Sequence, residues 1–78
     1  MTRSLFSPAY ERLRLRLVAA RHGRGLTQMQ LAVLLKRPQS FVSKYERGER
    51  RLDFIEVLEI ADTLHIDVTD LVRSVREG

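Results

Sequence analysis

The 78-residue chain contains no cysteine and no tryptophan, and it has only four glycines and two prolines. Without cysteine, neither a disulfide nor a thiolate metal site can supplement the core. No apolar run approaches the roughly 18 residues that a membrane span needs, and the N-terminal sequence lacks the hydrophobic stretch of a signal peptide. We therefore expect a cytoplasmic protein that has one small hydrophobic core and no membrane partner.

Residue sets that support catalysis or metal binding are also missing from the sequence. The two histidines, His22 and His65, are far apart and neither has neighbours typical of metal ligands. No Ser/His/Asp set and no glycine-rich phosphate loop is present, and the glycines at 23 and 25 are interpreted as a helix stop. The sequence predicts a protein that is not an enzyme and needs no metal, cofactor or small-molecule ligand.

Charge is distributed unevenly along the chain. Residues 1–51 carry twelve lysines and arginines against three acidic residues, a net +9, whereas residues 52–78 carry two against seven, a net −5. A basic half suits a polyanion, because each neutralised phosphate releases counterions. A solvated surface with a chance imbalance is the alternative interpretation, but the segregation of the signs favours nucleic acid as the partner.

Five helical segments are predicted, which gives an all-α fold in a single domain of residues 1–78 with frayed ends at 1–6 and 77–78. The residues that mark the helix starts are Ser7-Pro8, Thr27, Pro38, Asp53 and Asp67. Small polar or acidic residues cap helices, and a glutamine or acid three positions later completes a capping box. Residues 12–18 also alternate like a strand, but arginine and leucine favour a helix there. In the fourth helix, the inward-facing residues are predicted to be Phe54, Val57, Leu58, Ile60, Ala61 and Leu64.

Residues 27–48 read as two short helices around a turn at Lys36-Arg37. If Val42 and Tyr45 pack inward, the opposite face of the second of these helices carries Gln39, Ser40, Ser43 and Lys44. Amides, hydroxyls and a cation are groups that read base edges and hold phosphates in the major groove of DNA. An ordinary solvated polar face is the alternative interpretation of these four residues alone.

A longer ordered series of residues surrounds this segment. It consists of Arg21 four before Gly25, Leu26-Thr27-Gln28, Leu31-Ala32, Ser43, Glu46-Arg47-Gly48, Leu58, Ile60-Ala61, Leu64 and Leu71. In this order, the stretch from Leu17 to about Val72 resembles the Cro/phage-repressor family of helix-turn-helix domains, also called the Xre family. The resemblance implies a compact five-helix lambda-repressor-like domain whose third helix enters the major groove while the second crosses the backbone.

The resemblance also implies roles for individual positions. The positions that read bases in the family correspond to Gln39, Ser40, Ser43 and Lys44. The positions that contact phosphates correspond to Thr27, Gln28, Arg47, Arg50 and Arg51, and Gln28 also braces the recognition helix. Arg21 and Glu46 match a partly buried ion pair that ties the first helix to the third. Two positions depart from the family: Pro38 has no N–H to donate to a phosphate, and Lys36 stands where glycine is usual before the turn.

The sequence therefore predicts a sequence-specific regulator of transcription, expected to be a repressor, that binds double-stranded DNA as a homodimer on a two-fold operator. Val68, Val72 and Val75 are the predicted dimer seam, because they offer more apolar area than a small fifth helix needs. The N-terminal residues Leu5, Phe6 and Leu15 are the alternative seam. The alternative function is an antitoxin-like or other interaction module whose main partner is a protein.

Overall fold

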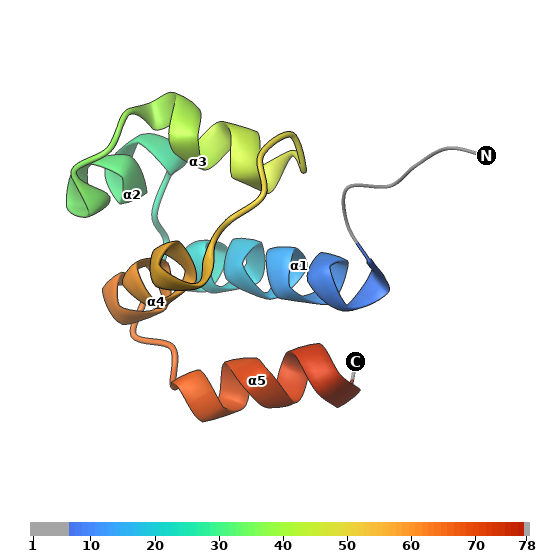
Figure 1. The fold of residues 1–78 in the computed structure, drawn as a ribbon. Helices are drawn as coiled ribbons and strands as arrows, with labels where there is room; N and C mark the ends of the chain where they lie inside the picture. Colours follow the sequence, from blue (N-terminus) through green and yellow to red (C-terminus); the bar gives the residue numbers. More distant parts are fainter. Residues whose placement is uncertain (1–6, 78) are drawn as a thin grey trace.

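The computed structural model describes residues 7–77, so the expectations for residues 1–6 and 78 lie outside the described part of the chain. Five helices follow one another in sequence: α1 (Pro8–Gly23), α2 (Gln28–Leu35), α3 (Gln39–Glu46), α4 (Phe54–Thr63) and α5 (Val68–Glu77). No strand occurs among residues 7–77. The predicted all-α, five-helix fold is thus confirmed (Figure 1).

The helices begin where short-range hydrogen bonds cap them. Ser7 Oγ accepts from the backbone N–H of Tyr10 at 3.1 Å, and Thr27 forms a reciprocal capping box with Gln30 at 2.8 and 3.0 Å. Asp53 makes the same arrangement with Glu56 at the start of α4. These side chains satisfy N–H groups that the first helical turn leaves without a partner. The predicted starts of α1, α2 and α4 are confirmed by this geometry.

The turn between α2 and α3 takes a left-handed residue that is not glycine. Lys36 ends α2 with φ of 59° and ψ of 43°, and the next N–H, of Arg37, bonds back to the Ala32 carbonyl at 3.0 Å. A left-handed conformation costs a non-glycine residue about 1–2 kcal/mol. Pro38 is the N-cap of α3, so α3 begins at Gln39, one residue later than predicted.

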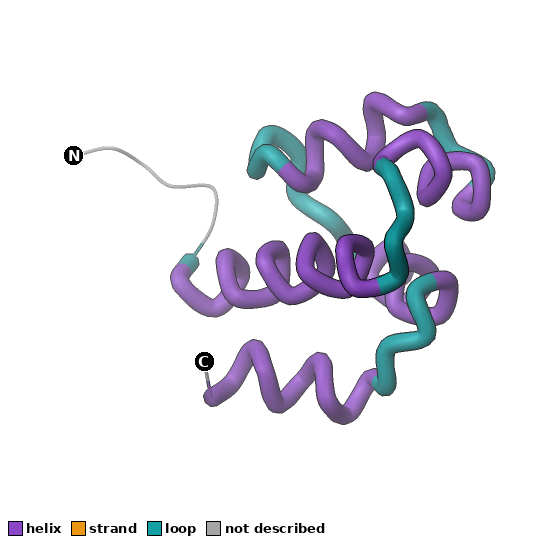
Figure 2. Tube along the Cα trace, turned by 180° about the vertical axis from the view of Figure 1, so that it is seen from behind, coloured by secondary structure: helices purple, strands orange, loops and turns teal. Residues whose placement is uncertain are grey.

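The core is formed by side chains from the first four helices, with Leu52, Leu64 and Ile66 from the connecting segments, and is closed by Leu71 of α5. Its largest fully buried members are Leu17, Leu31, Val42, Tyr45 and Ile60. In both views α1 lies between α5 on one side and the α2–α3 pair on the other (Figures 1 and 2). The long first helix therefore separates the helix-turn-helix from the fifth helix.

Two phenylalanines lie differently from what the sequence pattern indicates. Phe54, predicted to face inward, is 70% exposed, because it occupies the first turn of α4, on the rim of an open groove beside α5. Phe41, which the pattern did not assign to the core, is buried against Tyr45 with ring centroids 5.5 Å apart.

Within residues 7–77, no helix combines the length and apolar character that crossing a bilayer requires.

Candidate nucleic-acid interface

Helix α3 separates its apolar and polar residues onto opposite faces. Phe41, Val42 and Tyr45 are buried against the other helices. The opposite face presents Gln39, Ser40 and Lys44 as exposed residues and Ser43 as a half-buried one. Positions three and four apart share a helix face, so Ser43 neighbours both Gln39 and Ser40, and Lys44 neighbours Ser40, which places the four polar side chains together. They offer two amide donors, two hydroxyls and one ammonium group to a ligand.

Lys44 is the cation of this polar face. It is exposed, and it takes part in no ion pair among residues 7–77. Its three donors are therefore available to acceptor atoms of a partner. Amides and ammonium groups on a helix face match the acceptor pattern that guanine and adenine present in the major groove.

A buried ion pair fixes α3 against α1. Arg21 Nε donates to Glu46 Oε2 at 2.8 Å and Arg21 Nη2 donates to Glu46 Oε1 at 3.0 Å, and both side chains are more than nine-tenths buried. Arg21 Nη1 also donates to the carbonyl of Leu26 at 2.6 Å, which ties the α1–α2 loop to the pair. The hydrogen bond to Glu46 raises the pKa of Arg21, so the guanidinium remains charged despite its burial.

From this pair, side-chain hydrogen bonds continue to the polar face. Gln28 Nε2 donates to Glu46 Oε1 at 2.9 Å, and Gln39 Nε2 donates to Gln28 Oε1 at 3.3 Å. Gln28 thus joins the start of α2 to both ends of α3. An amide held by such a chain keeps a defined orientation before a ligand arrives, which lowers the entropy lost on binding.

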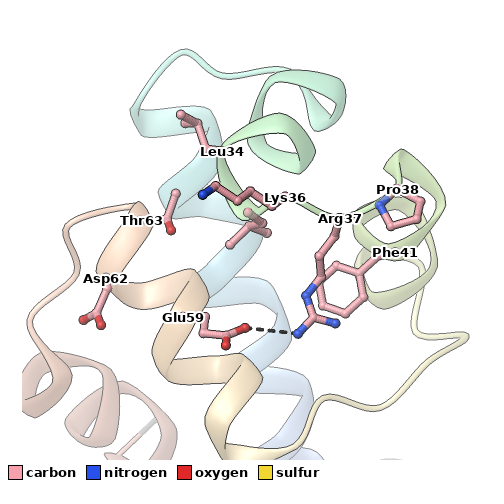
Figure 3. Close-up of a pocket in the computed structure, with 9 residues that line it drawn as sticks. Leu34, Lys36, Arg37, Pro38, Phe41, Glu59, Asp62 and Thr63 are labelled. Carbon is pink, nitrogen blue, oxygen red and sulfur yellow. Dashed lines mark hydrogen bonds and ion pairs between the residues drawn. The ribbon is translucent and has the colours of Figure 1, made fainter.

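A second set of contacts holds the other side of α3. The guanidinium groups of Arg37 and Arg50 lie 4.6 and 4.9 Å from the centre of the Phe41 ring. Both also pair with Glu56 of α4, Arg50 through two bonds of 2.8 and 2.9 Å and Arg37 at 3.4 Å. Figure 3 shows Arg37 against Phe41, with its second ion pair to Glu59. The bond from Arg50 lowers the pKa of Glu56.

One of the expected phosphate ligands, Arg50, is already bound to other residues of the protein. Arg50 is bound to Glu56 and stacked on Phe41, with 40% of its side chain exposed. Its guanidinium therefore positions the loop after α3 against α4. Sequence reasoning missed this role because nothing within a turn of Arg50 indicates that Phe41 lies beneath it.

The remaining expected phosphate ligands lie in different surroundings. Arg47 is exposed and pairs with Glu49 at 3.0 Å, an exposed contact of small energy that a phosphate can replace. Arg51 is exposed, with its guanidinium 4.5 Å from the centre of the Tyr10 ring. The hydroxyl of Thr27 already accepts the capping bond from Gln30.

Arg14 is a residue to which the sequence reasoning assigned no role at this interface. It bonds to Glu11 one turn earlier at 2.7 Å and also donates to the backbone carbonyl of Glu46 at the end of α3. The hydrogen bond from Arg14 lowers the pKa of Glu11. The spacing of Glu11 and Arg14 indicates their own contact, but no local signal indicates the one to α3.

No three histidine, aspartate or glutamate side chains of residues 7–77 come together as metal ligands.

Known helix-turn-helix proteins resemble this chain in sequence and in fold. A family model described as a helix-turn-helix domain matches residues 12–74. No curated protein matches the sequence.

Several chains of solved structures resemble this one. An XRE-family like protein from Pseudomonas syringae pv. tomato str. DC3000 has a TM-score of 0.82 and 42% sequence identity, over 88% of this chain and 84% of that chain. The clp gene regulator ClgR from C. glutamicum has a TM-score of 0.78 and 19% identity, over 99% of this chain and 96% of that chain. The second match shows a shared fold. The family model and the first match show that this chain belongs to the Xre-type helix-turn-helix domains.

Proposed function

We propose that this protein binds double-stranded DNA in a sequence-specific manner and represses transcription as a homodimer on a two-fold operator. The observation that carries the proposal is the polar face of α3. Its side chains Gln39, Ser40, Ser43 and Lys44 suit base edges, and the apolar side of the same helix is held rigidly in the core. In this role α3 lies in the major groove, and no chemical step follows binding.

Phosphate contacts are assigned to residues around this face. Thr27 and Gln28 lie at the start of α2, where backbone N–H groups and the helix dipole favour an anion. Arg47, Arg50 and Arg51 follow α3. Arg50 is bonded to Glu56, so it contacts a phosphate either through its remaining N–H groups or by exchanging Glu56 for the phosphate. Such contacts set the orientation of the protein on the duplex, whereas base contacts select the sequence.

The homodimer places its seam at the groove between α1, α4 and α5. Apolar side chains line most of this groove, which has a volume of about 160 Å³. Val68 and Val72 on its edge are 39% and 46% exposed. Val75 is half-buried in the same groove. Because α1 separates α5 from α3, this seam leaves both copies of the polar face open to DNA.

Selection of bound duplexes from a random pool tests the proposal with the full chain. We expect a two-fold motif with half-sites about 10–10.5 base pairs apart or a multiple of it. Affinity for the selected duplex should fall steeply between about 50 and 200 mM salt, because phosphate contacts release counterions. Failure to enrich any motif, or binding that salt leaves unchanged, would contradict DNA binding and favour the protein-interaction alternative.

A further inference from the structure

Helix α2 carries apolar residues on two opposite faces, one buried in the core and one exposed, and neither the proposed DNA contacts nor the dimer seam uses the exposed face. Leu31 and Ala32 are buried in the core. On the outer face, Met29, Val33 and Leu34 are 56%, 67% and 55% exposed. A helix that is hydrophobic all round is normally buried, and α2 approaches this pattern because Gln28 and Gln30 are its only polar residues. We propose that the outer face of α2 is a docking surface for an acidic amphipathic helix of a second protein.

The shape of this surface suits a short helix. Leu26 joins Met29, Val33 and Leu34 in a shallow, largely apolar groove of about 330 Å³, in which Gln30 is the one polar lining residue. Leu34 continues into a second hollow, which contains Arg24, Thr63 and His65. Eight residues of α2 extend about 12 Å, which corresponds to two turns of an opposing helix. An amphipathic helix presents its anchors at such spacing, with apolar side chains at positions i, i+4 and i+7.

The charges at the ends of the surface select the partner. Arg24 stands beside the Leu26 end, and Lys36 beside Leu34 on the other side, where Figure 3 shows the two residues as neighbours. Both cations are exposed, and neither takes part in an ion pair among residues 7–77. Two acidic residues, Glu59 and Asp62, line the same hollow as Lys36. Glu59 is paired with Arg37, so Asp62 is the one of these two acids without an ion pair in the described chain. Carboxylates flanking the apolar anchors of a partner would meet these cations.

The same charges argue against a second copy of this chain as the occupant. In a two-fold interface the same surface patch of each copy faces the other. Arg24 and Lys36 would therefore face cations across the seam. Like charges placed opposite each other weaken association. The groove beside α5 shares no residue with this surface, so a dimer formed there leaves the α2 surface free.

A displayed library of 14-residue helical peptides, with both anchor and flanking positions randomised, tests the proposal on the full chain. We expect enriched peptides with apolar residues at helical spacing and Asp or Glu at the flanks. Val33→Glu should lower their affinity at least tenfold while leaving melting temperature and binding to the selected DNA unchanged. Val72→Glu is the matched control, and it should leave peptide affinity unchanged.

Reversing the charges separates an acidic partner from a merely sticky surface. In Arg24→Glu/Lys36→Glu, enrichment should shift from acidic to basic flanks. Peptides enriched without acidic flanks, or enriched equally on Val33→Glu, would overturn the proposal. So would self-association of the wild type that Val33→Glu abolishes and Val72→Glu does not, because that result makes a second copy the occupant. A library that enriches nothing would also overturn it.

Discussion

Gln28 donates a hydrogen bond of 2.9 Å from its side-chain amide to the Glu46 carboxylate, so the first residue of α2 is held to the last residue of α3. The same carboxylate takes two bonds from Arg21 of α1. Glu46 therefore connects three helices at one buried point. Because this point is buried while Gln39 at the other end of α3 is exposed, stability and sequence recognition should respond differently to mutation.

Arg21→Ala and Glu46→Ala should each lower the free energy of unfolding by about 3–5 kcal/mol, because either change leaves a charge buried without its partner. Gln28→Ala, the control, should cost less because it removes a neutral donor and leaves the ion pair intact. Urea unfolding of the three variants measures the difference. Wild-type stability of Arg21→Ala together with lost DNA binding would move Arg21 into the DNA interface.

Lys44→Ala should relax the preference at one operator position, because a good base contact contributes about 1–3 kcal/mol of discrimination. Arg51→Ala is the comparison: it should weaken binding to all sequences alike and lower the salt slope by about 1. Repeated duplex selection and salt titrations with both variants provide the measurement. An unchanged motif for Lys44→Ala would remove this residue from the base-reading set.

The ion pair of Glu56 with Arg50 should make stability depend on acidity. Since Arg50 lowers the folded-state pKa of Glu56 below its ordinary value of 4.5, the stabilisation is fully present above about pH 4.5. It is lost as the pH falls through the lower folded-state pKa. Urea unfolding of wild type and Glu56→Gln should show a gap near neutral pH that narrows below about pH 4.5. A gap of constant size across this range would exclude the linkage.

Tyr45→Phe should raise stability by about 1 kcal/mol. The Tyr45 side chain is fully buried, and its hydroxyl has no hydrogen-bond partner among the described residues of the chain. Burial raises the pKa of this hydroxyl far above its ordinary range, so it remains neutral. Leaving a polar group buried without a partner costs roughly 1–3 kcal/mol, which phenylalanine avoids at nearly equal volume. Thermal melting decides, and a lower melting temperature for the variant would mean that the hydroxyl is bonded in solution.

Val72→Glu should convert the proposed dimer to a monomer, because it places a charge in the apolar seam beside α5. Val33→Glu, at a still more exposed apolar position on α2, should leave the dimer intact. Sedimentation at micromolar concentration, with and without the selected operator, distinguishes the two. A wild type that sediments as a monomer even on its operator would rule out the dimer.

The sequence by itself determined where α1, α2 and α4 begin and that one face of α3 is polar. Thr27 with Gln30, and Asp53 with Glu56, are pairs three residues apart, so the chain forms these caps through local contacts alone. The separation of apolar and polar residues on α3 likewise follows from helical periodicity. The ordered family residues add the expected partnership of Arg21 with Glu46, which spans 25 positions.

Only the tertiary structure decided the surroundings of Phe41, Phe54 and Arg50. Phe41 is buried beneath two guanidinium groups, from the turn before α3 and from the loop after it, and Arg50 is held there by Glu56 of the next helix. Phe54 has the apolar character of a core residue but lies where α4 meets an open groove. In each case the surroundings include residues of another helix or loop, whose positions follow from how the helices pack and not from the pattern within any one of them.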